Sequence, residues 1–290
     1  MKTKLLIVLE ALACLIVLVV HQRSDAVLGQ VSDEGKVYLP IIENIAQEPG
    51  SLDQMLNIPA GEFLMGCQPG SNGGIPCPSD ALQHKIYLDA YTIDRYEVTN
   101  VQYALCVADR ACSPPFKMES FTRPNYFGNP SYGKYPVIYV TWQDAVDYCN
   151  WAGKRLPTEA EWEKAARGTD GRLYPWGDQA ADCERANFLN IHLCSGDTSQ
   201  VGYYPSGASP YGAHDMAGNV MEWVSDWYQA NYYDISPYSN PLGPDSGTYK
   251  VLRGGSWFID ANYVKSTYRL ADNPDDFSLG YGFRCASSKQ

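Results

Sequence analysis

Long basic runs are missing from this sequence, and their absence limits which partners it can bind. The longest run is Lys154-Arg155, and the 290 residues carry 22 Lys and Arg against 33 Asp and Glu, a net charge of −11. Because an acidic surface repels phosphates instead of displacing their counterions, we expect no nucleic-acid partner. Cations are the better ligands for such a chain.

A hydrophobic run long enough to cross a membrane is missing as well. The longest, Leu5–Val20, has sixteen residues and is interrupted by Glu10, whereas a spanning helix needs about 20. Lysines before the run and small residues up to Ala26 after it give the layout of a secretory signal peptide. We therefore predict that residues 1–26 are a signal peptide and that the protein is secreted or held in the cell envelope. A membrane contact is expected only through this segment, if it is not cleaved.

Linkers are also absent, because no Ser/Gly/Pro-rich stretch or charge run divides the chain after Leu52. This predicts one domain over residues 52–286. Residues 27–51 precede it and contain the isolated apolar patch Val37–Ile42, so we predict an N-terminal arm or tether there. Helical patterns are few, whereas Gly, Pro, Tyr and Trp are plentiful, which is typical of an irregular domain that needs disulfides.

We also predict that the exported protein has no free thiol. Cys14 leaves with the signal peptide, and the eight remaining cysteines are an even number in an exported chain, which favours a complete disulfide framework. No C-x-x-C spacing occurs, which argues against a thiolate metal site. Three pairs are close in sequence and a long-range pair is left over. The predicted bonds are Cys67–Cys77, Cys106–Cys112, Cys183–Cys194 and Cys149–Cys285.

Capping residues and hydrophobic periodicity predict the regular elements. The predicted helices run from Thr99 or Asn100 toward Asp109, from Thr141 to Gly153 with Cys149 pointing inward, and from Thr158 to Gly168. The predicted strands are Asn57–Gly66, one or two within Lys85–Thr99, and Pro136–Val140, which we expect to be buried. After Gly168 we expect loops and short strands.

Five ordered segments carry a resemblance to a known family. They are Ile58-Pro-Ala-Gly-Glu-Phe-Leu-Met-Gly66, Glu97-Val-Thr-Asn100, Trp151-Ala-Gly-Lys-Arg-Leu-Pro-Thr-Glu-Ala-Glu-Trp-Glu163, Asp215-Met-Ala-Gly-Asn-Val-Met-Glu-Trp223, and Arg253-Gly-Gly-Ser-Trp257 followed by Gly282-Phe-Arg-Cys-Ala286. In this order they resemble the sulfatase-modifying factor family, which includes the formylglycine-generating enzymes. The resemblance covers Leu52 to Ala286 and implies an irregular α+β fold related to C-type lectins. It also implies the pairing of Cys149 with Cys285.

The resemblance also implies where oxidase chemistry would lie. Formylglycine-generating enzymes oxidise a sulfatase cysteine with oxygen and a copper(I) ion held by two thiolates, and copper(I) prefers sulfur. The two cysteines align here with Ile259 and Val264, and the chain has no cysteine between Cys194 and Cys285. Met221 replaces the aromatic residue common before the glutamate of its motif. We therefore expect a pseudoenzyme that does not use copper.

Structural calcium is the cofactor that the resemblance implies. One predicted site consists of Asp215 and Glu222 with the carbonyl oxygens of Gly218 and Val220. The other consists of Asn187, Asp197 and the carbonyl oxygen of Phe188. In the alternative, Asp215 and Asn219 only satisfy backbone groups of their turn, and Glu222 pairs with Arg253 or Arg284.

Other catalytic centres are not indicated. His84, His192 and His214 lack the spacing of metal ligands, and Ser256 has no evident His/Asp partner. The predicted binding groove consists of Ser256, Trp257, Met221 and Arg253. Further contacts with a partner are expected from tyrosines of a polar insertion, namely Tyr228, Tyr232, Tyr233 and Tyr238.

Three functions are therefore weighed. The first is an exported, calcium-stabilised module that binds a peptide, protein or glycan. The second is an oxidase that makes formylglycine, or performs another oxidation, with a centre that does not use thiolates. The third is a structural domain of the cell envelope, held by its N-terminal arm.

Overall fold

The computed structural model describes residues 53–70, 76–190 and 194–288. The predicted signal peptide and N-terminal arm lie outside these residues, as does His192. Within the described residues, no helix has the length and apolar character needed to cross a membrane.

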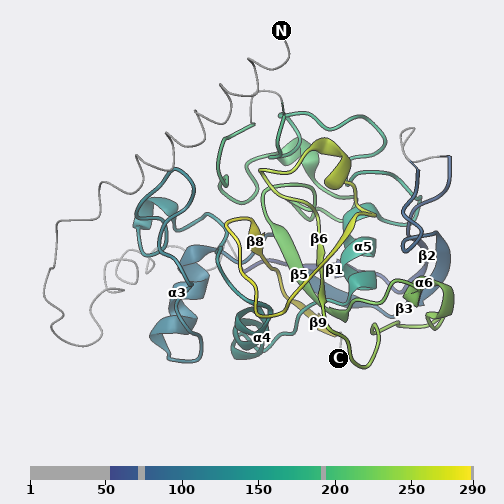
Figure 1. The fold of residues 1–290 in the computed structure, drawn as a ribbon, viewed down its shortest axis with the longest axis horizontal. Coiled ribbons are helices and arrows are strands. Elements are labelled where there is room, and N and C mark those ends of the chain that lie inside the picture. Colours follow the sequence, from purple (N-terminus) through teal and green to yellow (C-terminus); the bar gives the residue numbers. More distant parts are fainter. Residues whose placement is uncertain (1–52, 71–75, 191–193, 289–290) are drawn as a thin grey trace, which may run out of the picture. The chain divides into compact units, whose positions relative to one another are not determined.

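The first sheet joins the start and the end of the domain (Figure 1). Strand β4 (Tyr91–Asp94) lies between β1 (Met55–Ile58) and β9 (Ala286–Ser288) and is antiparallel to both. A separate hairpin pairs β2 (Gly61–Met65) with β3 (His84–Leu88). The single strand predicted over residues 57–66 is therefore two strands, because Pro59 has no N–H to continue a ladder. One or two strands were predicted within 85–99, and the structure has two, β3 and β4.

The largest sheet lies at the centre of the domain. Its order is β7 (Arg269–Asp272), β6 (Lys250–Arg253), β5 (Met221–Trp227) and β8 (Tyr281–Gly282), antiparallel except between β5 and β8. Trp223 and Leu252 pack into one hydrophobic cluster, whereas Val224 and Val251 pack into another. Side chains alternate along a strand, so β5 and β6 separate two cores and are buried on both faces.

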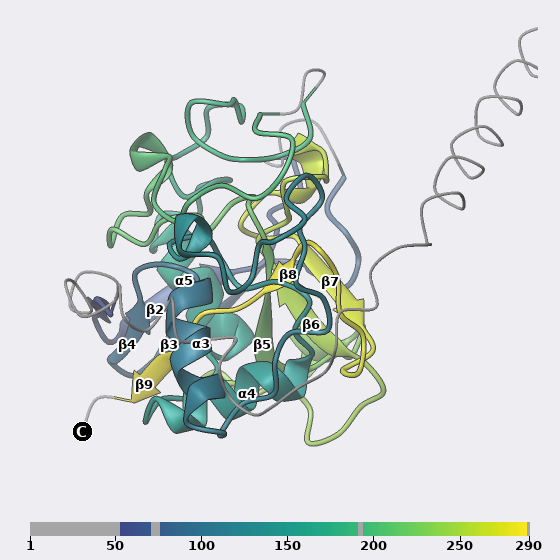
Figure 2. The same cartoon turned by 90° about the vertical axis from the view of Figure 1, so that its left-hand side faces the viewer.

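Three helices start at a threonine, as predicted. Capping boxes formed by Thr99, Thr141 and Thr158 open α3 (Asn100–Ala108), α4 (Trp142–Trp151) and α5 (Glu159–Arg167). Figures 1 and 2 show α3 and α4 side by side at one end of the domain, and α5 packs against β2, β5 and β6. Among the residues that the structure describes, the remaining helical segments are α6 (Tyr232–Ile235) and the 3₁₀ turns Pro130–Tyr132, Pro205–Gly207 and Ala261–Tyr263.

The strand predicted at Pro136–Val140 is wrong, although the segment is buried. Only Pro136 forms a β-bridge, with Thr99. Tyr139 has a φ of 59°, in the left-handed region, and this interrupts the extended backbone within the apolar run. Val137 and Val140 are nevertheless fully buried beneath α3 and α4. Burial was therefore readable from the sequence, whereas backbone conformation was not.

The disulfide framework is confirmed. The four bonds are Cys67–Cys77, Cys106–Cys112, Cys149–Cys285 and Cys183–Cys194. Cys149 is fully buried on the inner face of α4, and its bond to Cys285 closes a sequence separation of 136 residues. Four disulfides indicate that the domain folds in an oxidising compartment.

Loops fill the stretch between α5 and β5, in the upper part of Figure 2. The described residues of this stretch include no α-helix or strand and only one 3₁₀ turn. The predicted irregular α+β fold is therefore confirmed. These loops contain most of the predicted calcium ligands.

Candidate functional site

The four predicted groove residues lie in the interior. Met221, Arg253 and Ser256 are fully buried, and Trp257 is nearly so. Arg253 donates to Glu159 at 3.0 Å and to Glu163 at 2.6 Å, so its charge is used inside the fold. A groove formed by these side chains stays a prediction.

The two positions expected to lack thiols lie in the loop after β6. Val264 is fully buried in a cluster that includes Tyr174 and Phe188. Ile259 is half-buried and packs against the separate cluster that contains Trp223 and Leu252. Both side chains therefore contribute to hydrophobic packing, in two different clusters.

Glu222, predicted as a calcium ligand, pairs with a buried arginine. Its carboxylate accepts hydrogen bonds from Arg284 Nε at 2.6 Å and from a second nitrogen of the same guanidinium at 2.7 Å. Trp162 Nε1 donates to the same carboxylate at 2.8 Å. The predicted alternative of a Glu222–Arg284 ion pair is thus present, whereas Arg253 pairs elsewhere.

Two further buried carboxylates, those of Glu97 and Asp215, lie near this ion pair and leave a surplus of negative charge. Burial, and then the charges of Asp215 and Glu222, raise the pKa of Glu97 well above its ordinary value. Burial also raises the pKa of Asp215 to about 6. Among the described residues, no ion pair within 4 Å reaches Glu97 or Asp215. One guanidinium, that of Arg284, therefore faces three acidic side chains.

The two predicted calcium loops meet at Asn219. Its backbone N–H donates to the carbonyl oxygen of Asn187 at 2.7 Å, and its side-chain amide donates to Glu97 at 2.8 Å. Gly218 has a φ of 84°, and a Cβ there would lie 2.2 Å from the Asn187 carbonyl oxygen. Glycine is therefore required where the loops touch.

The sequence did not predict a role for Glu97. Its carboxylate accepts from Asn219 and from the backbone N–H of Val220, so it fixes the turn from inside the core. The sequence feature that could have indicated this role is the position of Glu97 in Glu97-Val-Thr-Asn100, one of the five motif segments.

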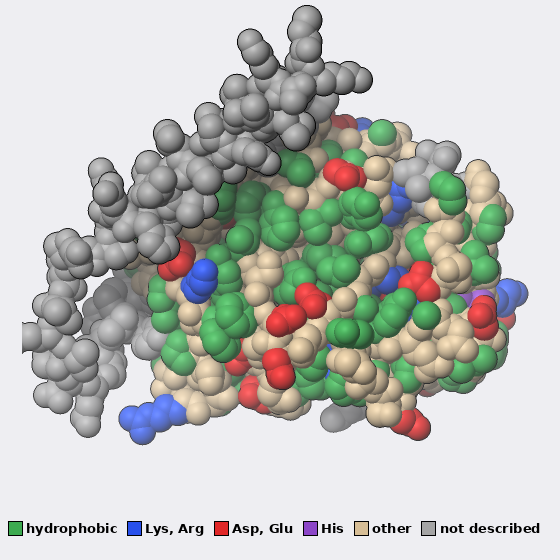
Figure 3. Space-filling view, in the orientation of Figure 1, with side chains coloured by type: hydrophobic (Ala, Val, Ile, Leu, Met, Phe, Trp, Pro, Cys, Tyr) green, Lys and Arg blue, Asp and Glu red, His purple; other side chains and the backbone are tan. Residues whose placement is uncertain are grey.

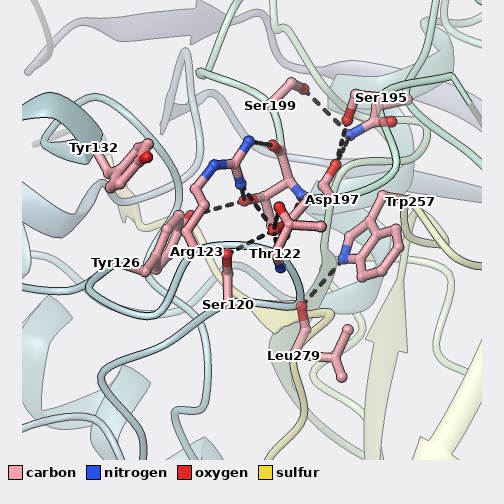
Figure 4. A network of polar contacts seen from close by, with 12 residues as sticks. Ser120, Thr122, Arg123, Tyr126, Tyr132, Ser195, Asp197, Ser199, Trp257 and Leu279 are labelled. Carbon is pink, nitrogen blue, oxygen red and sulfur yellow. Dashed lines mark hydrogen bonds and ion pairs between the residues drawn. The ribbon is translucent and has the colours of Figure 1, made fainter.

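Asp197, predicted for the other calcium site, instead fixes a loop. Figure 4 shows Ser120, Thr122 and Arg123 directed at its carboxylate. Ser120 Oγ donates at 2.6 Å, Thr122 donates through its backbone and its hydroxyl at 2.8 and 2.7 Å, and Arg123 lies at 3.1 Å. Burial acts to raise the pKa of Asp197, but the hydrogen bonds of Ser120 and Thr122 outweigh it and hold that pKa below its usual value.

The donor sets fit calcium to different extents. Asn187 Oδ1 is a buried acceptor with no donor in the described part of the chain, as expected for a metal ligand. The Asp197 carboxylate already accepts hydrogen bonds from its neighbours. Of the two side chains predicted for this site, only that of Asn187 therefore has an acceptor without a donor. The Asp215 loop combines surplus negative charge with backbone carbonyls, which suits a hard cation. No three His, Cys, Asp or Glu side chains of the described residues are placed to hold a metal ion by themselves.

Aromatic side chains are exposed on the loop that Asp197 fixes. Phe116 is 63% exposed and Phe121 is 64% exposed, and Met118 lies between them. The Phe121 ring centre lies 5.4 Å from that of Trp257, whereas Phe116 stacks on Phe277 at 3.9 Å. We call the side chains of Phe116, Met118, Phe121, Trp257 and Phe277 the aromatic ledge. Figure 4 shows Trp257 beside the Asp197 network, with its Nε1 directed at the Leu279 carbonyl.

A hollow of about 310 Å³ adjoins the aromatic ledge and is lined by residues 119–124. Figure 3 shows hydrophobic side chains over much of the face drawn in Figure 1, with few Lys or Arg side chains among them. Exposed apolar patches mark sites of contact with other molecules. The ledge is therefore a candidate contact surface, and the sequence did not single it out.

The remaining predicted residues do not form a centre of chemistry. His84 lies against Tyr233, and His214 lies against Tyr96. In the polar insertion, Tyr233 is buried and Tyr228 and Tyr232 pack partly into the core, whereas Tyr238 is half exposed. Tyr238 is the member of this group best placed to meet a partner.

A profile of the family described as "Sulfatase-modifying factor enzyme 1-like domain" matches residues 42–289. The protein named serine/threonine-protein kinase pkn1 of Chlamydia caviae is 39% identical over 246 residues, which are 80% of this chain but 38% of that relative. The chain thus spans well under half of the length of this relative.

Relatives of similar length are formylglycine-generating enzymes or are named after them. The Streptomyces coelicolor enzyme is 34% identical over 83% of this chain and 91% of its own. A mouse protein named inactive C-alpha-formylglycine-generating enzyme 2 is 32% identical over 84% of this chain and 87% of its own. The structure of PvdO from Pseudomonas aeruginosa matches with a TM-score of 0.67 and 27% identity, over 81% of this chain and 94% of that one.

Proposed function

Because this chain belongs to the sulfatase-modifying factor family, we propose that it is an exported binding module without the cysteine oxidase chemistry of the formylglycine-generating enzymes. One observation carries the proposal: all eight cysteines from Cys67 to Cys285 are in disulfides. The positions aligned with the copper ligands are Ile259 and Val264, whose side chains offer no lone pair to a metal. Copper(I) held by thiolates has no place in such a domain.

The proposed contact surface is the aromatic ledge. Phe121 and Phe116 present apolar rings to solvent, and aromatic anchors next to a hollow are typical of the centres of protein interfaces. Asp197 holds the loop from below through Ser120 and Thr122, so the rings are fixed before a ligand arrives. Preorganisation lowers the entropy cost of binding. The ligand that fits this chemistry is a peptide or protein segment with an apolar side chain.

Calcium is proposed at the Asp215 loop alone. Asp215, with the carbonyl oxygens of Gly218 and Val220, would hold it, and its charge would offset the surplus of the three buried carboxylates. Arg284 and Trp162 already donate to both oxygens of Glu222, so Glu222 is left out of the proposed ligands. Asp197 is left out of the proposal because Ser120, Thr122 and Arg123 already satisfy it. We expect the melting temperature to rise with calcium and fall with a chelator in the wild type, and to stay constant in Asp215→Asn. Equal melting temperatures in both solutions would remove calcium from the account.

The binding proposal is tested by selecting peptides from a displayed random library on the immobilised protein. Selected peptides should bind Phe121→Ala at least about tenfold more weakly, because a central aromatic contact is lost. The control is Tyr203→Ala, which removes another exposed ring (68% exposed) that is not part of the ledge. Peptides that bind Phe121→Ala as tightly as the wild type would place the contact surface elsewhere, and selection of glycans in a parallel array would change the ligand class.

A further inference from the structure

A second cavity lies near the C-terminal strand, apart from the aromatic ledge. Its volume is about 530 Å³, within the range of ligand sites. The apolar side chains that line it come from β3, β4, α4 and two loops. They are Leu88, Tyr91, Trp142, Val146, Leu156 and Leu242. We call it the Leu242 cavity.

Leu242 gives this cavity its exposed wall. Its side chain is 71% exposed, whereas Leu88, Tyr91 and Leu156 beneath it are buried. A second hollow, of about 430 Å³, lies on the other side of Leu242. Exposure of a large aliphatic side chain to water is unfavourable. Covering Leu242 would therefore stabilise the protein by burying apolar area. Something apolar is therefore expected to cover the cavity.

The described chain begins close to the cavity. Asp53 Oδ1 lies 2.5 Å from Lys154 Nζ, which also contacts Asp94 at 2.8 Å. Lys154 is followed by Arg155, which lines the cavity. In β1, Met55 lies opposite Asp94 and Ile58 lies opposite Tyr91, so Asp53 is five residues, or roughly 17 Å, along the strand from the cavity floor.

The sequence before Asp53 supplies an apolar segment within reach. Val37–Ile42 reads Val-Tyr-Leu-Pro-Ile-Ile, and the eleven residue steps from Ile42 to Asp53 extend to at most about 40 Å. Between them, Glu43 and Glu48 are acidic and no residue is basic. Lys154 and Arg155, on the path to the cavity, already pair with Asp53, Asp94 and Glu161, so docking would depend on the apolar residues of the segment and not on its charge.

We propose that Val37–Ile42 docks in the Leu242 cavity of its own chain. Residues 37–52 lie outside the described structure, so the proposal rests on the cavity, on the position of Asp53 and on the length and composition of the segment. A segment tethered roughly 17 Å away by a chain long enough to span that distance has a high effective concentration at the cavity, so even weak apolar contacts hold it there. Docking would strap the N-terminal arm across the C-terminal strand.

Hydrogen exchange of the full-length chain, read by mass spectrometry, tests the proposal. We expect the amides of residues 37–42 to exchange at least about tenfold more slowly than in a synthetic peptide of the same sequence. Leu242→Asp and Ile41→Asp, which alter the two sides of the contact, should each abolish this protection. The matched control is Ile235→Asp, which changes a side chain that is 63% exposed and lines only the neighbouring hollow.

Three results would overturn the proposal. Exchange of the wild-type segment at the rate of the free peptide would show that it does not dock. Release by Ile235→Asp as well as by Leu242→Asp would show that the contact is not specific to the cavity. Protection that appears only at high protein concentration would show that a second copy of the chain covers the cavity instead. Melting temperatures of the variants, measured in parallel, exclude unfolding as the cause of release.

Discussion

Removing the Cys149–Cys285 disulfide should cost far more stability than removing Cys106–Cys112. In the loop-entropy description, the cost grows with the logarithm of the length of chain that the bond closes. The sequence separations are 136 and 6 residues, which give about 5 and about 2.4 kcal/mol. Both changes replace two buried half-cystines by alanine, so the packing losses largely cancel. The expected difference between the double variants is about 2.6 kcal/mol.

Urea unfolding followed by tryptophan fluorescence measures this difference. The chain has seven tryptophans, and a domain of this size has a urea slope near the upper end of the range of about 1–3 kcal/mol/M. The midpoint of Cys149→Ala/Cys285→Ala should therefore lie about 1 M below that of Cys106→Ala/Cys112→Ala. Equal midpoints, or the reverse order, would refute the view that the long-range bond stabilises the domain by restricting its unfolded chain.

The remaining predictions concern ionisation, a buried ion pair and thiols. Burial, and then the charge of Glu159, raise the pKa of Asp226 to about 7. The folded state therefore binds the extra proton between about pH 4 and 7, and stability falls as pH rises through that window, by up to about 1.4 kcal/mol per pH unit. Glu159, Glu161 and Lys250 are the charged groups facing it, and in Asp226→Asn the slope of unfolding free energy against pH should decrease; an unchanged slope contradicts this. Glu222→Gln should lower the free energy of unfolding by about 3–5 kcal/mol, because it removes the carboxylate that forms the ion pair with buried Arg284, and Glu222→Gln/Arg284→Met should recover part of the loss. A double variant less stable than the single one would contradict that reasoning. Thiol labelling of the unreduced protein without its first 26 residues should find no reactive cysteine, and one or two labelled residues would break the disulfide assignment.

Local signals predicted the helices and the disulfides well. Thr99, Thr141 and Thr158 cap their helices through side chains that reach only three residues ahead, so a short window of sequence contains the whole interaction. Disulfide pairing followed from even parity and short separations. These features depend on residue types and short spacings that can be read directly from the sequence.

Long-range contacts explain what the sequence did not predict. Residues 136–140 look like a strand because they are apolar, but the positive φ of Tyr139 is set by surrounding segments. Asp197 resembled a metal ligand, yet its partners come from residues 120–123, about 75 positions earlier. Exposure of Phe121 is likewise a property of the folded loop. The spacing of residues along the chain does not show which distant residues become neighbours in the fold.

The central claim is that this member of the family has the fold without the cysteine oxidase chemistry. The direct measurement supplies copper, oxygen and a sulfatase peptide containing the target cysteine, and follows the mass of the peptide. The Streptomyces coelicolor formylglycine-generating enzyme is the positive control, and a metal-free reaction is the negative control. Because the proposal puts Ile259 and Val264 at the positions of the copper-binding thiolates, it predicts no conversion to the aldehyde above the metal-free rate. Conversion above that rate would contradict the account and favour an oxidase with a different centre.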